Sequence, residues 1–291
     1  MPRVEIDESG GFCFGVDQVI HTAEDHLKKG ETLYGLGEMV HNDREVKRLR
    51  ALGLKTINHN DLPALKGKKV LFRAHGEPPS TFRIAEENGL EVIDGTCPIV
   101  SSLQKRIRKT YLGMDPGREQ IVIFGKTHHP ETIGLMGQVE GNAVVVNSMD
   151  EISRVDPDKT VHLFSQTTMD PDQFDEVKEA IHSHIKAALR SSFHSNCTIC
   201  GQMKKRKPGL ARFAKKYDVL IFVSGKNSSN GKMLYEFCRS LNPRSHWISE
   251  KKDLDPTWFL DASSIGISGA TSTSREQLEI IRNQVQNLIS S

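Results

Sequence analysis

The sequence is organised around one short stretch, Val92-Ile93-Asp94-Gly95-Thr96-Cys97-Pro98-Ile99-Val100. An apolar strand is predicted up to Ile93 and a helix from Pro98 on, because proline is tolerated best at the first position of a helix. Cys97 therefore lies at or beside the N-cap. Unpaired N–H groups and the positive end of the helix dipole favour the thiolate there, which is the form of cysteine that binds metals.

Two further segments repeat this plan of strand, cysteine and helix. One ends at Cys13, and the other is Asn196-Cys197-Thr198-Ile199-Cys200. We expect one member of the Cys197/Cys200 pair to join Cys13 and Cys97 in a single site. Cys238 lies within an apolar helical pattern and is interpreted as a small buried hydrophobic residue.

The composition favours a small-molecule partner. Lys and Arg (39) nearly balance Asp and Glu (37) in the 291 residues, so no overall field points to nucleic acid or a membrane. No apolar run approaches the roughly 18 residues of a membrane span, and the N-terminus lacks the apolar core of a signal peptide. Five cysteines are too few and too scattered for a disulfide framework. Together these features predict a cytoplasmic enzyme.

Helical segments with a period near 3.6 alternate with short β-branched runs. Strands are predicted at 31–36, 54–57, 69–74, 90–93, 120–124, 143–146, 160–164, 218–223 and 265–268, and helices at 14–29, 43–52, 80–88, 99–111, 132–139 and 172–189. Asn42 and Asp43 can cap the helix that runs to Leu52, and Ser80 is expected to cap the helix that runs to Asn88. Alternation implies parallel sheets, whose ligands bind beyond the carboxyl ends of the strands. We predict an α/β fold of three similar lobes, residues 1–96, 97–193 and 194–291, each carrying one cysteine of a common site.

Histidines, hydroxyls and amides gather in the loops at strand ends and helix starts: His41, His75, His129, Ser228, Ser229, Asn230 and Ser272. With helix N-terminal N–H groups they form a donor set suited to a phosphate or diphosphate. Taken singly, each histidine is more often a solvated residue, and residues 227–230 fit a plain turn before a cap equally well. There is no Walker sequence and no G-x-G-x-x-G, so nucleotide binding is unsupported.

Two charged motifs have an ordinary and a functional interpretation. Glu131, after His129-Pro130, is either a first-turn helix carboxylate or, in a site that must supply protons, the acid. The run Lys204-Lys205-Arg206-Lys207 is most often a solvated helix face, and the less common alternative is a docking surface for an acidic electron carrier.

The cysteines leave several classes of protein open. Three thiolates without a fourth suit an iron–sulfur cluster with one exchangeable iron, or a zinc ion held by three cysteines and a water. An open metal position indicates catalysis. Zinc binding by Cys197-x-x-Cys200 alone is weakly supported, because a second such pair is missing. A zinc hydrolase or lyase and a non-enzymatic iron–sulfur sensor are the alternatives to an iron–sulfur enzyme.

Eight motifs, in this order and over nearly the full length, resemble the 4-hydroxy-3-methylbut-2-enyl diphosphate reductase family, the LytB/IspH type. They are Gly11-Phe12-Cys13-Phe14-Gly15-Val16, Val40-His41-Asn42, Ala74-His75-Gly76, Thr96-Cys97-Pro98, His129-Pro130-Glu131, Gln166-Thr167-Thr168, Lys226-Asn227-Ser228-Ser229-Asn230 and Gly269-Ala270-Thr271-Ser272. Any one of them alone would be weak. The resemblance implies a trefoil of three α/β lobes around a central [4Fe–4S] cluster.

The resemblance also implies the site residues. Cys13, Cys97 and Cys200 would hold the cluster, with Cys200 chosen by matching Thr198-Ile199-Cys200 to the family's third cysteine segment. Here the chain departs from the family, because Cys197 is extra and Gly201-Gln202-Met203 replaces a more usual Ala-Thr-containing continuation. The residues that would hold the diphosphate are His41, His75, Ser228, Ser229, Asn230 and Ser272. His129 would support the substrate, while Thr167 and Glu131 would orient and protonate its hydroxyl group.

The implied reaction is a reductive dehydroxylation. It would convert 4-hydroxy-3-methylbut-2-enyl diphosphate, with two electrons and two protons, into isopentenyl diphosphate and dimethylallyl diphosphate. This is the last step of the methylerythritol phosphate route to isoprenoids. Reduced ferredoxin or flavodoxin would be the electron donor.

Overall fold

The computed structural model describes residues 2–226 and 228–290. In chain order its strands and α-helices are β1 (Arg3–Ile6), α1 (Phe14–Lys28), β2 (Leu33–Leu36), α2 (Asp43–Ala51), β3 (Lys55–Ile57), β4 (Lys69–Phe72), α3 (Pro79–Glu87), β5 (Glu91–Asp94), α4 (Pro98–Gly113), β6 (Glu119–Phe124), α5 (Pro130–Gln138), β7 (Ala143–Val146), β8 (Thr160–Ser165), α6 (Pro171–His184), β9 (His194–Ser195), α7 (Gly201–Ala214), β10 (Val219–Val223), α8 (Ser229–Leu241), β11 (Ser245–Ile248), β12 (Ser264–Gly269) and α9 (Arg275–Ser290). Short 3₁₀ helices are η1 (His59–Ala64), η2 (Met149–Arg154), η3 (Ala187–Ser192), η4 (Lys251–Asp253) and η5 (Pro256–Phe259).

The chain forms two compact units. The first runs up to Thr56 and resumes at Lys205, and the second is Ile57–Lys204. In the first unit β1 pairs with β12, so that Arg3 lies beside Ser264. A strand from the first predicted lobe therefore belongs to the same sheet as strands from the last, and the division into three lobes at 96/97 and 193/194 stays a prediction.

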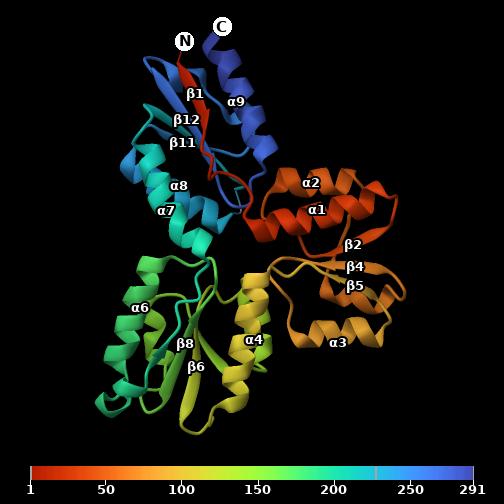
Figure 1. Cartoon of the computed structure of the whole chain (residues 1–291), viewed down its shortest axis with the longest axis vertical. Helices are drawn as coiled ribbons and strands as arrows, with labels where there is room; N and C mark the ends of the chain where they lie inside the picture. Colours follow the sequence, from red (N-terminus) through yellow and green to blue (C-terminus); the bar gives the residue numbers. More distant parts are fainter. Residues whose placement is uncertain (1, 227, 291) are drawn as a thin grey trace. The chain divides into compact units, whose positions relative to one another are not determined.

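The main sheet of the first unit has the strand order β1-β12-β10-β11 and parallel pairing throughout. All five residues of β10, Val-Leu-Ile-Phe-Val, are buried because alternate side chains face different helices. Ile221 packs in a cluster with Ile281 of α9, and Phe222 packs with residues of α7 and α8. Figure 1 shows α9 on one side of this sheet and α7 and α8 on the other.

The main sheet of the second unit has the strand order β7-β6-β8-β9, again parallel. Ile121 and Ile123 of β6 pack with residues of α4 and α5. On the other face the Phe124 ring lies 6.3 Å from the ring of Phe174 in α6, centroid to centroid. In the same unit β4 and β5 form another parallel pair, and in the first unit β2 and β3 are neighbouring strands.

The predicted fold class, α/β with parallel sheets, is confirmed. The predicted elements lie within a few residues of the observed ones, and of the two caps predicted for α2 it is Asn42 that caps the helix, while Asp43 is its first residue. The prediction that Ser80 caps its helix is wrong, since α3 begins at Pro79, which needs no N–H partner at the first helical position. Helix α6 ends at His184 rather than at residue 189, because the next residue, Ile185, is extended and turns into the core.

Among the described residues, no helix combines the length and the apolar character that crossing a bilayer requires.

A glycine in the first unit tests how tightly the sheet and helices pack. A Cβ at Gly266 in β12 would lie 2.7 Å from Cδ2 of Tyr217 and 2.8 Å from Cε1 of Phe213. Gly266→Ala is expected to lower the free energy of unfolding by about 1–3 kcal/mol, because the two rings must move. In α7, Gly209 meets only the Ser9 hydroxyl at 3.7 Å, so Gly209→Ala is expected to be neutral or stabilising by about 0.5–1 kcal/mol. Urea unfolding of both variants measures the difference, and equal stabilities would contradict this packing.

Candidate active site

Polar motifs of the second unit follow directly on strand ends. His75 lies three residues after β4, Cys97 three residues after β5, and Thr167 two residues after β8. The loop after β6 leads to His129 and Glu131 at the start of α5. These side chains therefore lie where parallel sheets place their ligands, beyond the carboxyl ends of the strands.

Glu131 and Thr167 form a closed pair. The Thr167 backbone N–H donates to Oε1 of Glu131 at 2.6 Å, and the Thr167 hydroxyl donates to Oε2 at 2.8 Å. Glu131 is 1% exposed and Thr167 is 4% exposed. Both oxygens of the carboxyl group are thus held by one residue in a site that water does not reach freely.

Burial raises the pKa of Glu131 from an ordinary 4.5 to about 7, although the two hydrogen bonds from Thr167 act in the opposite direction. No charged group contributes to this change in the pKa of Glu131. The rise in pKa is therefore caused by loss of contact with water. A carboxyl group with such a pKa holds its proton in much of the population at neutral pH, as a general acid must.

His129 is the N-cap of α5. Its Nδ1 accepts a hydrogen bond from the backbone N–H of Glu131 at 3.1 Å. An accepting Nδ1 places the proton of the neutral ring on Nε2. The rings of His75 and His129 meet edge to face with centroids 5.2 Å apart, so the second unit brings these two predicted site residues together.

The turn after His75 requires glycine. Gly76 has a φ of +73°, and a Cβ there would lie 2.6 Å from Nε2 of Gln104. A Cβ at Gly134 in α5 would lie 3.2 Å from the carbonyl oxygen of Gly76. The loop that carries His75 therefore packs directly on the helix that carries His129 and Glu131.

Two of the predicted cysteine ligands lie in the second unit. Cys97 is the N-cap of α4, its side chain makes no capping hydrogen bond, and its backbone N–H donates to the Ala74 carbonyl at 3.0 Å. Cys200 immediately precedes α7, and its N–H donates to the Thr167 carbonyl at 2.9 Å. Thr167 is therefore hydrogen-bonded both to Cys200 and to Glu131.

Cys197, Cys200 and Cys238 differ from one another in burial. Cys197 is exposed and Cys200 is partly buried. Thr198 anchors the segment, because its hydroxyl donates to the Ser165 carbonyl at 2.6 Å and accepts from the Ser165 N–H at 2.8 Å. Cys238 is fully buried, which raises the pKa of its thiol to about 12. The interpretation of Cys238 as a buried hydrophobic residue is confirmed.

In the first unit Cys13 is the N-cap of α1. Its side chain makes no capping hydrogen bond, and its backbone N–H donates to the Thr271 carbonyl at 3.2 Å. Gly11, two residues before, has a φ of +126°, a conformation that favours glycine. The Cys13 loop is thus joined to the segment that carries Ser272.

The first unit also gathers predicted diphosphate ligands. The hydroxyls of Ser228 and Ser272 lie 3.4 Å apart, and Nδ2 of Asn230 donates to the Thr271 hydroxyl at 2.8 Å. A Cβ at Gly225 would lie 2.8 Å from the carbonyl oxygen of His41, so the loop leading to Ser228 packs on the His41 backbone. Asn227 and the side chain of Ser229 lie outside the described part of the chain.

The amide of Asn230 has one buried atom, Oδ1, without a hydrogen-bond partner among the described residues. Because the Thr271 hydroxyl can accept or donate, rotating the amide by 180° would present the NH₂ group at that position. An NH₂ group is what an anionic oxygen requires. The local geometry is therefore compatible with the predicted role of Asn230.

The basic run at residues 204–207 is not a uniform solvated face. Arg206 is 5% exposed, and its Nη1 lies 3.2 Å from Oδ2 of Asp7. Its Nη2 donates to the Ser268 hydroxyl at 3.1 Å and also to the Gly269 carbonyl. Sequence reasoning missed this buried ion pair, because helical periodicity alone does not identify a charged residue on a core-facing position.

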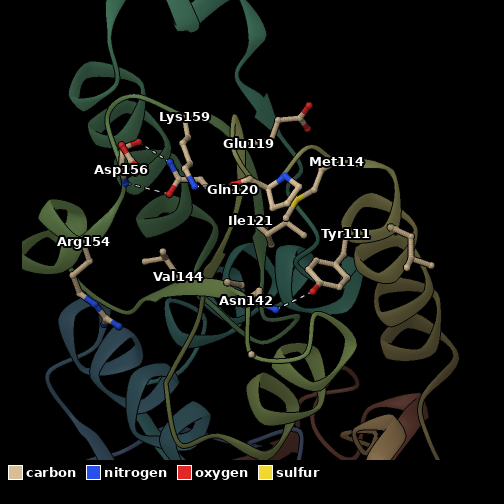
Figure 2. A pocket seen from close by; sticks show the side chains of 14 residues that line it. Tyr111, Met114, Glu119, Gln120, Ile121, Asn142, Val144, Arg154, Asp156 and Lys159 are labelled. Carbon is tan, nitrogen blue, oxygen red and sulfur yellow. Dashed lines mark hydrogen bonds between the residues drawn. The ribbon is translucent and has the colours of Figure 1, made fainter.

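A cavity of about 780 Å³ lies at the other end of the second unit's main sheet, near the amino ends of β6 and β7. Several of its polar side chains bind one another or backbone groups: Nδ2 of Asn142 donates to the Tyr111 hydroxyl at 2.8 Å, and Gln120 exchanges two hydrogen bonds with the backbone of Asp156 (Figure 2). None of the predicted site residues lines this cavity.

The sequence pattern of the family described as LytB protein matches residues 4–286. The chain belongs to this family. Curated LytB-type relatives named 4-hydroxy-3-methylbut-2-enyl diphosphate reductase are similar over 99% of this chain: that of Bacteroides thetaiotaomicron is 50% identical and that of Phocaeicola vulgatus is 44% identical, with 99% of each relative covered. The resemblance inferred from the eight motifs is confirmed.

Solved structures agree with this LytB assignment. A structure titled as (E)-4-hydroxy-3-methyl-but-2-enyl diphosphate reductase, the terminal enzyme of the non-mevalonate pathway, is 31% identical with a TM-score of 0.75, covering 99% of this chain and all of that one. A structure of a Plasmodium falciparum reductase, 24% identical, has a TM-score of 0.84 over 97% of this chain and 87% of its own, and shows the likeness of fold.

The raised pKa of Glu131 predicts a pH-dependent stability. Above pH 4.5 the unfolded chain loses this proton while the folded protein keeps it, so burial becomes increasingly unfavourable up to a pH of about 7. Relative to Glu131→Gln, the wild-type free energy of unfolding should fall by roughly 2–3 kcal/mol between pH 5 and pH 8. Denaturant titrations of the two cluster-free proteins measure this difference, and parallel pH curves would show that Glu131 ionises near its ordinary pKa.

Proposed function

We propose that this LytB-family protein is a 4-hydroxy-3-methylbut-2-enyl diphosphate reductase. It adds two electrons and two protons to the substrate, breaks the allylic C–O bond, and releases water with isopentenyl diphosphate or dimethylallyl diphosphate. This is the last step of the methylerythritol phosphate route. The observation that carries the proposal is the buried, protonatable Glu131 held by Thr167, in a chain that matches the reductases over nearly its whole length.

The diphosphate is bound by neutral donors and imidazoles. The proposed ligands are His41, His75, Ser228, Ser229, Asn230 and Ser272. The contact between Ser228 and Ser272 supports this role, because two hydroxyls at that spacing can donate to neighbouring oxygens of one anion. Holding the diphosphate fixes the allylic end of the substrate relative to the proton donors.

Glu131 protonates the leaving hydroxyl. Its site is dry, so the proton is kept at neutral pH and is transferred to the oxygen as the C–O bond breaks. Thr167 orients the substrate hydroxyl, and its two hydrogen bonds to Glu131 hold the carboxyl group in position. His129 supports the substrate through Nε2, the nitrogen that carries the proton in the neutral ring.

The second proton goes to carbon. Loss of the hydroxyl leaves an allyl fragment that accepts a proton at either end, which accounts for the two products. The bound diphosphate is itself close to this fragment in the substrate and can donate the proton. The residues that hold the diphosphate therefore influence the site of protonation as well as affinity.

The cysteines fit a [4Fe–4S] cluster held at three corners. The five cysteines form no disulfide with one another, and Cys13, Cys97 and Cys200 each stand at or immediately before a helix N-terminus. The exposure of Cys197 and the bond from Cys200 to Thr167 support Cys200 as the third ligand. When bound, the cluster supplies the two electrons and a Lewis-acidic iron.

Reduced ferredoxin or flavodoxin is proposed as the electron donor. Lys204 and Lys205 are exposed in the first two turns of α7, the helix that begins directly after Cys200, and offer positive charge to an acidic carrier. Cysteines that form no disulfide and an air-sensitive cluster fit a reducing compartment, so the cytoplasm is proposed as the location.

An anaerobic assay tests the proposed function. Purified protein should be brown, contain iron and sulfide, and consume 4-hydroxy-3-methylbut-2-enyl diphosphate with reduced methyl viologen as electron source. Glu131→Gln should keep iron content and absorption while turnover falls at least about 100-fold, because a general acid contributes about that much or more. Colourless, zinc-loaded protein without turnover would overturn the proposal, and normal turnover by Glu131→Gln would overturn the role of Glu131.

The third cysteine ligand has a matched control within four residues. Cys200→Ser should lose most of the bound iron and sulfide after anaerobic reconstitution, because one of three thiolate ligands is gone. Cys197→Ser makes the same chemical change at an exposed position and should retain the cluster. Iron analysis and the visible absorption spectrum compare the two variants. The reverse pattern would identify Cys197 as the ligand.

A further inference from the structure

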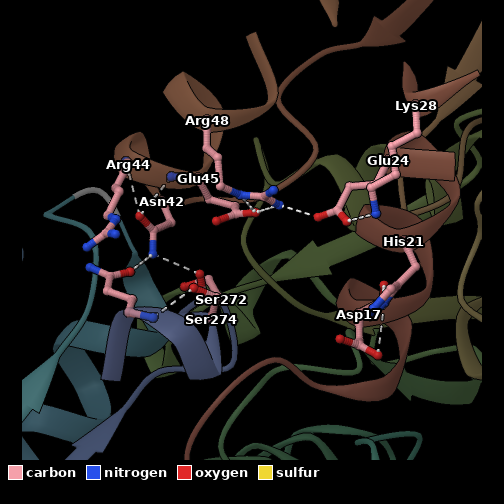
Figure 3. A network of polar contacts seen from close by, with 11 residues as sticks. Asp17, His21, Glu24, Lys28, Asn42, Arg44, Glu45, Arg48, Ser272 and Ser274 are labelled. Carbon is pink, nitrogen blue, oxygen red and sulfur yellow. Dashed lines mark hydrogen bonds and ion pairs between the residues drawn. The ribbon is translucent and has the colours of Figure 1, made fainter. Parts of the chain in front are cut away.

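Asn42 follows the proposed diphosphate ligand His41 and is 3% exposed. Its Oδ1 accepts from the backbone N–H groups of Arg44 and Glu45, at 3.2 and 3.4 Å, and so caps α2. Its Nδ2 donates to the Ser272 carbonyl and to Oε1 of Gln277, each at 3.0 Å. Figure 3 shows this amide between the start of α2 and the segment that carries Ser272.

The orientation of this amide is determined by its neighbours. Two N–H groups, which can only donate, face Oδ1, and a carbonyl oxygen, which can only accept, faces Nδ2. Rotating the amide by 180° would turn its NH₂ group toward the N–H groups of Arg44 and Glu45 and its oxygen toward the Ser272 carbonyl oxygen. Three of the four hydrogen bonds would then be lost. Gln277 is held in turn, because its Nε2 donates to the Ser249 carbonyl at 2.8 Å. Asn42 therefore has all its hydrogen bonds made, and its position is closely specified.

Three segments carry the proposed diphosphate ligands of the first unit, and we name them the clamp segments. They are residues 41–42, Gly225 together with Ser228 and the first residues of α8, and residues 271–272. Each contacts the next. Asn42 bonds the Ser272 carbonyl, the Ser272 hydroxyl meets that of Ser228, and Gly225 packs on the His41 carbonyl. Of these three contacts, only the one from Asn42 is a hydrogen bond from a buried side chain to backbone more than 200 residues away.

We propose that Asn42 is a positioning residue that sets the spacing between His41 and Ser272 and thereby the affinity for the substrate's diphosphate. Capping fixes Asn42 on α2, and the Nδ2 bond holds the Ser272 backbone to it. Without that bond the carbonyl of the buried Ser272 loses the hydrogen bond that it accepts from Asn42, so the segment shifts toward another donor. The inference rests on the proposed function and adds a determinant of diphosphate binding that does not touch the reacting atoms.

The test separates capping from bridging. Asn42→Ser keeps an oxygen that caps α2 but has no group that reaches Ser272 and Gln277 as the amide does. It should raise both the KM for 4-hydroxy-3-methylbut-2-enyl diphosphate and the Kd for inorganic pyrophosphate about tenfold. The kcat at saturation should stay within about threefold, since the four hydrogen bonds of Asn42 go to Arg44, Glu45, Ser272 and Gln277 and not to Glu131 or Thr167. Kinetics and calorimetric titration of the anaerobic holoenzyme give these values.

Asn58→Ser is the matched control. Asn58 caps η1 through its own side chain, so the chemical change is the same at a cap that carries no proposed ligand, and KM and Kd should stay within twofold of wild type. Asn42→Asp is the second variant, because aspartate is a strong cap that places a carboxylate against the Ser272 carbonyl, and it should raise KM and Kd by more than the serine variant does.

Two results would overturn the inference. One is unchanged KM and Kd in both folded Asn42 variants. The other is a fall in kcat alone, which would place Asn42 in the chemical step. Wild-type protein that neither turns over the substrate nor binds pyrophosphate would instead overturn the proposed function itself, and it is recognised because the failure appears before any substitution is made.

Discussion

The pairing of Glu131 with Thr167 is the interaction on which the proposed chemistry depends. The carboxyl group of Glu131 is 1% exposed, so its ionisation without a neighbouring cation costs free energy. The two hydrogen bonds from Thr167 only partly offset that cost. The protein therefore keeps a proton where an exposed glutamate would have lost it. The same Thr167 accepts the backbone N–H of Cys200, so the proton donor and a proposed cluster ligand share one support.

Glu131 and Thr167 can meet only because the two strands that precede them end side by side in one sheet. In the second unit β6 and β8 are paired in parallel, with Phe124 beside Ser165. The helix carrying Glu131 follows β6, and Thr167 follows β8, so both arrive at the same end of one sheet. Buried residues on both faces of β6 hold that sheet rigidly against α4, α5 and α6. The precision of the site derives from this packed core rather than from the loops themselves.

In the first unit several loops carry the proposed ligands of an anion, and none of these ligands is a cation. Buried polar side chains link those loops. Asn42 joins α2 to the Ser272 segment, and Arg206 with Asp7 joins the Cys13 loop to the end of β12 through Ser9 and Gly269. These links are made by the protein's own side chains, so they favour loops that are held together before the substrate arrives, although Nε of Arg206 has no hydrogen-bond partner among the described residues.

Much of this protein is determined by local sequence. Alternation of apolar runs and helical patterns predicts the α/β class, and Pro98 after Cys97 or Asn42 before α2 predicts a helix start, because caps depend on a few neighbouring residues. The order of the motifs likewise identifies the family. What sequence could not determine depends on residues far apart in the chain: the burial that raises the pKa of Glu131, the exposure of Cys197 beside a half-buried Cys200, the core position of Arg206, and the bond from Asn42 to Ser272. Solvation and long-range hydrogen bonding are properties of the folded surroundings, and only the tertiary structure supplies those surroundings.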